Sequence, residues 1–145
     1  MKFPITFEVY AKSKPGMSSY WDSKVKDLPA IKTCIPTDFF GPGKAYTAED
    51  LFALAIIDCF ISMFKYKTEK RGVVFKEIDI RATAILDNDE TINKTWIPEI
   101  NVYIKILNPS DEIKAKEIID FCVENCPISN SIKTAKIFHI EIENT

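Results

Sequence analysis

The segment TAEDLFALAIIDCFISMF, from Thr47 to Phe64, decides how the rest of the chain must be arranged. Thr47 is a residue type that favours the N-cap of a helix. Glu49 and Asp50 follow it in the first turn, where the helix dipole stabilises carboxylates. Between Leu51 and Met63 the residues are almost all apolar. This pattern predicts a helix that is buried on every side.

Two residues interrupt this apolar run, Asp58 and Cys59. A thiol in a buried helix can be an ordinary core residue, because free cysteine is among the most buried residue types. It can also be a reactive group, and Cys59 is therefore the first candidate for chemistry. A helix without a polar side needs more cover than one sheet of this chain can give, so we expect an obligate homodimer.

The composition is that of an ordinary soluble globular protein, with 145 residues, 46% of them hydrophobic and 28% charged. We therefore expect one domain spanning residues 1–145. The net charge of −2 and the scattered basic residues argue against a nucleic-acid partner. No apolar run reaches the ~18 residues of a membrane span. The N-terminus also lacks the pattern of a signal peptide, so we expect a cytoplasmic location with no membrane partner.

Alternation of apolar and polar residues is the signal for the β-strands of this chain. It predicts strands at 3–9, 18–26, 28–34, 73–86, 97–107 and 134–143. We expect 73–86 and 97–107 to pair as an antiparallel hairpin, with Leu86 among the inward residues of the first strand.

A second helix is expected after Asn108–Pro109–Ser110, with an apolar face that runs from Ile113 to Cys126. The loop at 35–45 contains two prolines and two glycines, and its aromatic pair Phe39–Phe40 is expected to pack onto the core. The order of strands, helix, strands, helix and strand indicates an α+β fold. Its sheet is expected to be antiparallel, with the helices on one side.

The four cysteines are Cys34, Cys59, Cys122 and Cys126, and in a reducing compartment they should be free thiols, metal ligands or redox-active groups. Cys126 precedes Pro127 and could cap the short turn that follows. The positive end of that turn would then lower the pKa of the Cys126 thiol and make it a nucleophile or a resolving thiol. The structural alternative is a small apolar residue that ends a helix face.

A metal site is a less favoured interpretation of these cysteines. Cys122 and Cys126 are four residues apart, but the chain has no C-x-x-C pair and a single histidine, His139. We expect His139 on the solvated face of the last strand, beside Glu141. No phosphate-binding loop or nucleophile-elbow motif is present in the sequence, and we expect neither a metal nor a cofactor.

Three segments together resemble one known family: FFGPGKAY at 39–46, AEDLFALAIIDCF at 48–60 and CPISNSI at 126–132. The chain resembles the osmotically induced protein C / organic hydroperoxide resistance (OsmC/Ohr) family. The resemblance implies an OsmC-like fold with a long central helix and an intertwined homodimer with two sites formed across the subunit interface. It also implies a thiol peroxidase of the oxidative stress response that reduces organic hydroperoxides and hydrogen peroxide.

The resemblance gives roles to three residues. Cys59 corresponds to the peroxidatic thiol, which would become a sulfenic acid. Cys126 corresponds to the resolving thiol, which would form a disulfide that an external dithiol of lipoyl type reduces. Glu49 corresponds to the acid that pairs with an arginine in peroxidase members.

The sequence departs from the family pattern in its basic residues. The arginine of peroxidase members comes from the N-terminal strands, whereas the only arginines here are Arg71 and Arg81. Lys24 could supply the charge but not the bidentate fork of a guanidinium. Asp58 also stands where a small residue is more usual. The alternative hypothesis is therefore an OsmC-like protein without peroxidase activity that binds an apolar small molecule at the dimer interface.

Overall fold

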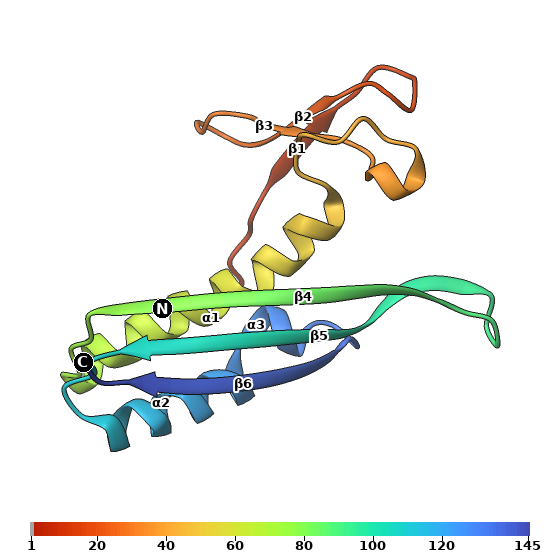
Figure 1. Cartoon of the computed structure of the whole chain (residues 1–145). Helices are drawn as coiled ribbons and strands as arrows, with labels where there is room; N and C mark the ends of the chain where they lie inside the picture. The colour runs from red at the N-terminus through yellow and green to blue at the C-terminus, as the bar shows by residue number, and fades with distance from the viewer. Residues whose placement is uncertain (1) are drawn as a thin grey trace. The chain divides into compact units, whose positions relative to one another are not determined.

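The computed structural model describes residues 2–145, which form two compact units, a first unit of residues 2–51 and a second unit of residues 52–145 (Figure 1). The elements in chain order are β1 (Val9–Lys12), β2 (Trp21–Val25), β3 (Ile31–Thr33), the 3-10 helix η1 (Thr37–Phe39), α1 (Ala48–Arg71), β4 (Glu77–Asp89), β5 (Lys94–Leu107), α2 (Glu112–Asn125), α3 (Pro127–Asn130) and β6 (Ala135–Glu143). The predicted α+β class is confirmed.

The first unit contains an antiparallel sheet in the order β1-β2-β3. The strand predicted at 3–9 is wrong, because β1 begins only at Val9, which pairs with Val25. Since Val25 is the last residue of β2, the residues before Val9 have no strand opposite them. Phe3 and Phe7 are accordingly 73% and 87% exposed.

The loop before α1 is held by backbone hydrogen bonds and not by buried rings. The N–H of Phe40 donates to the Thr37 carbonyl at 3.0 Å, and the N–H of Gly41 donates to the Pro36 carbonyl at 2.9 Å. Phe39 and Phe40 are 45% and 84% exposed. The prediction that this aromatic pair packs onto the core is therefore wrong for this chain.

Helix α1 begins as predicted and ends later than predicted. The Asp50 N–H donates to the Thr47 hydroxyl at 3.2 Å, and the Thr47 N–H donates to the Asp50 carboxylate at 2.9 Å, which is a reciprocal cap. The predicted end at Phe64 is wrong, since the charged residues up to Arg71 continue the helix. Gly72, at φ 65°, follows the last turn.

Among residues 2–145, no helix combines the length and the apolar character that a membrane span requires.

Only one side of α1 is fully buried in this chain. The residues of that side recur every four positions, as expected for a helix stripe: Ile56, Phe60, Phe64 and Thr68. Asp58 is exposed, as are Leu54 and Tyr66, which are 36% and 54% exposed. The predicted burial on every side is therefore wrong for a single chain. One sheet and one neighbouring helix can cover only one stripe of a helix.

The second unit places α1, α2 and α3 on one face of a sheet with the order β4-β5-β6 (Figure 1). The predicted hairpin of β4 and β5 is confirmed. β6 runs parallel to β5, from the pair Glu99–Ala135 to the pair Leu107–Glu143. The expectation of an antiparallel sheet is therefore wrong for this pair of strands, because α2 and α3 carry the chain back to the start of β5 before β6 begins.

The core of the second unit lies between this sheet and the helices. Strand β5 contributes four inward residues that are at most 2% exposed: Ile100, Val102, Ile104 and Ile106. Leu86, predicted to point inward, is 39% exposed, because the strand register shifts between Ile85 and Asp87. Ile113 is 73% exposed, because it lies five residues before the buried Ile118 and so on a different side of α2.

The loop before α1 can be tested at Gly41, where the backbone of Ile35 leaves no space for a side chain. A Cβ added at Gly41 would lie 1.7 Å from the Ile35 carbonyl oxygen, so the backbone would have to move. Gly41→Ala should lower the free energy of unfolding by about 3 kcal/mol or more, measured by urea denaturation. The control is Gly16→Ala, where φ is 111° and the space is open, so only the backbone cost of about 1–2 kcal/mol applies. Equal losses in both variants would contradict the described loop.

Candidate functional site: a cluster of three thiols

Three of the four cysteines lie in the second unit and belong to one apolar cluster. Cys59 comes from the middle of α1, Cys122 from the last turn of α2, and Cys126 from the residue that joins α2 to α3. Cys122 and Cys126 are 0% and 1% exposed, whereas Cys59 is half-buried. All are free thiols. The structure thus brings together the predicted pair, Cys59 and Cys126, and adds Cys122 to it.

The pKa of Cys126 moves in the direction opposite to the prediction. Burial and, to a smaller extent, the neighbouring Cys59 thiol together raise the pKa of this thiol to about 12, while a hydrogen bond with Ser129 opposes the shift. The predicted lowering is wrong because α3 has only four residues and the Cys126 side chain makes no capping hydrogen bond to it. So short a helix end does not offset the desolvation of a thiolate.

Cys122 is the thiol that sequence reasoning left without a role. Burial raises the pKa of the Cys122 thiol to about 11. The positive charge of Lys67 opposes this increase, and Cys59 adds to it. The ammonium of Lys67 lies 4.0 Å from the centre of the Phe121 ring. Lys67 follows Cys59 on α1 by eight residues, which is just over two helix turns and leaves the two side chains about a quarter turn apart around the helix. No sequence signal identifies Lys67 as a neighbour of Cys122, because the two residues lie on different helices.

Neither arginine serves the thiols. The guanidinium of Arg71 donates to the Glu117 carboxylate at 2.8 Å. The guanidinium of Arg81 lies over the Tyr103 ring, 4.1 Å from its centre, on the face of the sheet opposite the helices. Within the second unit, the cation that lowers the pKa of a clustered thiol is Lys67, and the thiol is Cys122, whose burial has the larger and opposite effect.

Glu49, the third predicted site residue, lies in the first turn of α1 and belongs to the first unit. Its Oε2 atom is buried and has no hydrogen-bond partner among residues 2–145.

Cys34 is in the same unit, where it is 1% exposed and its thiol donates a hydrogen bond to the Ala45 carbonyl at 3.8 Å. No ion pair joins Lys24 to Glu49 in the part of the chain that the structure describes.

The first unit also contains an apolar groove of about 620 Å³. It is lined by Val9, Tyr10, Ala11, Ser23, Lys24, Val25, Leu28, Pro29, Ile31 and Leu51. Lys24 carries the only charged side chain of this lining, and the stem of a lysine can lie along apolar surface. The groove is large enough for a small apolar molecule.

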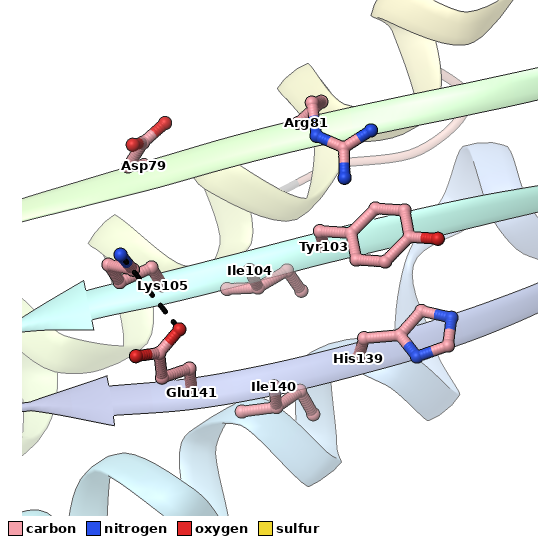
Figure 2. Close-up of a pocket in the computed structure, with 8 residues that line it drawn as sticks. All are labelled: Asp79, Arg81, Tyr103, Ile104, Lys105, His139, Ile140 and Glu141. Carbon is pink, nitrogen blue, oxygen red and sulfur yellow. Dashed lines mark ion pairs between the residues drawn. The ribbon is translucent and has the colours of Figure 1, made fainter.

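The outer face of the second sheet carries a stacked row of side chains across its three strands (Figure 2). Arg81 lies over Tyr103, and the Tyr103 and His139 rings stack at 4.5 Å. His139 Nε2 is 3.0 Å from Asn101 Oδ1. The predicted placement of His139 on the solvated face is confirmed. These groups satisfy one another and lie on the side of the sheet away from the thiols, so they support the sheet and not the thiol chemistry.

A second row on this face consists of ion pairs. Lys105 lies 3.9 Å from the Glu141 carboxylate (Figure 2). It also lies 3.5 Å from the carboxylate of Glu143. The two rows border an open pocket of about 410 Å³.

In the described residues no group of three or more histidine, cysteine, aspartate or glutamate side chains is arranged to hold a metal ion.

The thiol cluster sits in a segment that matches a family model. The model of the OsmC-like proteins matches residues 41–141. The chain belongs to the OsmC-like family. The match contains Glu49, Cys59, Cys122 and Cys126. No match was found among the curated proteins.

Solved structures agree with this assignment at the level of the fold. An OsmC-like protein of unknown function from Vibrio cholerae has a TM-score of 0.82 at 15% identity, over 94% of this chain and 99% of that one. An organic hydroperoxide resistance protein from Elizabethkingia anophelis has a TM-score of 0.76 at 18% identity, over all of both chains. The organic hydroperoxide resistance protein OhrB of Bacillus subtilis has a TM-score of 0.68 at 18% identity, over 96% and 98%.

The raised pKa values of the buried thiols predict a loss of stability in alkali. Above pH 9.0, the ordinary pKa of a cysteine, the unfolded chain releases thiol protons that the folded chain keeps up to about pH 11 for Cys122 and about pH 12 for Cys126. The folded state then binds more protons than the unfolded state, so the free energy of unfolding falls as pH rises through this range.

Urea denaturation of the reduced protein between pH 7 and pH 12 tests this dependence. Cys126→Ala should flatten the decrease relative to the unsubstituted chain, because alanine does not titrate. All lysines and tyrosines are present in both proteins, so the difference between the two curves reports the substitution. Parallel stability curves for the two proteins would contradict the burial of this thiol.

Proposed function

We propose that this OsmC-like protein is a thiol peroxidase that reduces organic hydroperoxides, and hydrogen peroxide as well. The observation that carries the proposal is the meeting of Cys59 and Cys126, which come from different helices and are neighbours in one apolar cluster. A peroxidase of this type needs one thiol that the peroxide can reach and a second that forms a disulfide with the first. The half-buried Cys59 suits the first role and the buried Cys126 the second.

The proposed reaction has three steps. The Cys59 thiolate attacks one peroxide oxygen, the O–O bond breaks, and Cys59 becomes a sulfenic acid; the alkoxide that leaves takes up the proton that the Cys59 thiol released and departs as an alcohol. The Cys126 thiol then displaces the sulfenic oxygen as water and forms the Cys59–Cys126 disulfide. An external dithiol of lipoyl type donates two electrons, restores both thiols and becomes a disulfide itself. No bound cofactor takes part in these steps.

The surroundings of the cluster support an organic substrate. Phe52, Ala53 and Ile57, on the turns of α1 around Cys59, pack against the apolar core with it. An apolar approach favours a hydroperoxide with a hydrocarbon group, because such a group gains free energy on leaving water.

A homodimer is part of the proposal. The apolar sides of α1 that this chain leaves half-exposed are the surface that a second copy would cover.

A cytoplasmic location is also part of the proposal, since four free thiols persist in a reducing compartment.

An alternative function is the binding of an apolar small molecule without peroxide chemistry. Two observations favour it: both arginines are engaged away from the thiols, and the first unit has an apolar groove of about 620 Å³. A binding protein would keep its function when Cys59 and Cys126 are both replaced by alanine. The peroxidase would lose it.

Stopped-flow reaction of the reduced protein with cumene hydroperoxide and with hydrogen peroxide tests the peroxidase directly. The expected result is fast oxidation by cumene hydroperoxide, slower oxidation by hydrogen peroxide, and a Cys59–Cys126 disulfide in the mass map. Cys59→Ala should abolish the reaction, whereas Cys34→Ala, the buried cysteine of the other unit, should leave it unchanged. Thiols that stay reduced at millimolar peroxide would exclude the peroxidase and favour the binding protein.

Glu49 is proposed as the acid that orients a positively charged group toward the site. Its buried, unpartnered Oε2 atom retains the capacity to accept such a hydrogen bond. Glu49→Gln keeps the size and removes the charge, so the rate constant for oxidation of Cys59 by cumene hydroperoxide should fall about tenfold or more. Asp58→Asn is the control, because Asp58 adjoins Cys59 but is exposed. Equal rates for Glu49→Gln and the unsubstituted protein would remove Glu49 from the mechanism.

A further inference from the structure

The last turn of α2 presents two thiols to the core and not one. Cys122 and Cys126 are four residues apart, and the Cys126 N–H donates to the Cys122 carbonyl at 3.1 Å. Residues with this spacing lie on the same side of a helix. Both side chains are at most 1% exposed and belong to the apolar cluster against which Cys59 packs.

Cys59 packs against the apolar cluster that contains both of these thiols. In addition to burial, a hydrogen bond with Cys59 and its charge raise the pKa of Cys126, and the charge of Cys59 raises the pKa of Cys122. The family roles use only one of the two. Cys122 therefore remains a buried thiol next to the reactive one, without an assigned function.

The electrostatic environments of Cys122 and Cys126 differ. Burial raises the pKa of Cys122, and the charge of Lys67 opposes that increase. The pKa of Cys126 is raised by burial, by Cys59 and by Cys122, and a hydrogen bond with Ser129 opposes that increase. Since the thiolate is the attacking species in disulfide exchange, the positive charge of Lys67 favours Cys122 as an attacking thiol.

We infer that Cys122 is a second disulfide partner of Cys59, interchangeable with Cys126, so that the site is a three-thiol exchange centre. The inference deepens the proposed function, on which it rests for the source of the oxidising equivalents.

Two reactions form the additional disulfide. In the direct reaction, the Cys122 thiol attacks the Cys59 sulfenic sulfur, water leaves, and the Cys59–Cys122 bond forms. In the exchange reaction, the Cys122 thiolate attacks the Cys59 sulfur of the Cys59–Cys126 disulfide, and Cys126 leaves as a thiolate that takes up a proton. The exchange moves a bond without net oxidation, so it needs no further reactant.

The test uses diamide, which takes two electrons and two protons from a pair of nearby thiols and does not require peroxidase activity. Four full-length proteins are compared, all with Cys34→Ala: one without further change, Cys122→Ala, Cys126→Ala, and the double variant Cys122→Ala/Cys126→Ala. Alanine is chosen over serine because a hydroxyl at these buried positions would lack a partner. Each protein receives one equivalent of diamide and, in parallel, one equivalent of cumene hydroperoxide, and the disulfides are mapped by mass spectrometry.

The inference predicts an intramolecular Cys59–Cys122 disulfide in Cys126→Ala, and a mixture of Cys59–Cys122 and Cys59–Cys126 disulfides when Cys122 and Cys126 are both present. After peroxide, a sulfenic-acid probe should label Cys59 in the double variant at least tenfold more than in Cys126→Ala. If Cys126→Ala fails to fold, the mixture in the protein that retains both thiols decides the question. Absence of the Cys59–Cys122 disulfide from every folded protein would overturn the inference. Diamide crosslinks without any reaction with peroxide would overturn the proposed peroxidase and leave the three-thiol centre standing.

Discussion

Burial of one stripe of α1 against the sheet is the constraint on which the second unit depends. Ile56, Phe60 and Phe64 on that stripe pack in one cluster with the inward residues of β5, which are at most 2% exposed. Each of these large side chains contributes about 2 kcal/mol or more when buried. The same packing fixes the rotation of α1 and so holds Cys59 beside the end of α2, where Cys122 and Cys126 are buried.

Local pattern predicted elements of both units. The N-cap at Thr47 in the first unit, and the hairpin of β4 with β5 and the solvated position of His139 in the second, all follow from short-range rules. The resemblance to the OsmC/Ohr family, carried by three short segments, is confirmed by the family match over residues 41–141. The meeting of Cys59 with Cys126 was expected from that resemblance alone, because no spacing within one helix or strand implies it.

The errors arise where a residue depends on a neighbour that is distant in sequence. Alternation at 3–9 predicted a strand, but no partner strand extends to those residues. The parallel pairing of β6 depends on the path of α2 and α3, which periodicity does not give. For Cys126, the local helix end favoured a lower pKa, while burial by the surrounding core raised it to about 12. Proximity of Lys67 and Cys122 was missed for the same reason.

The position of the cysteines links redox state to folding. A disulfide from Cys59 to either thiol of the other helix would close a long loop that contains β4 and β5. By chain entropy, a loop of this length destabilises the unfolded state by about 4 kcal/mol. Thermodynamic linkage requires that the fold then stabilises the disulfide by the same amount. The folded protein would therefore hold its oxidised form more tightly than a free dithiol of equal chemistry, and its reductant would need a correspondingly lower potential.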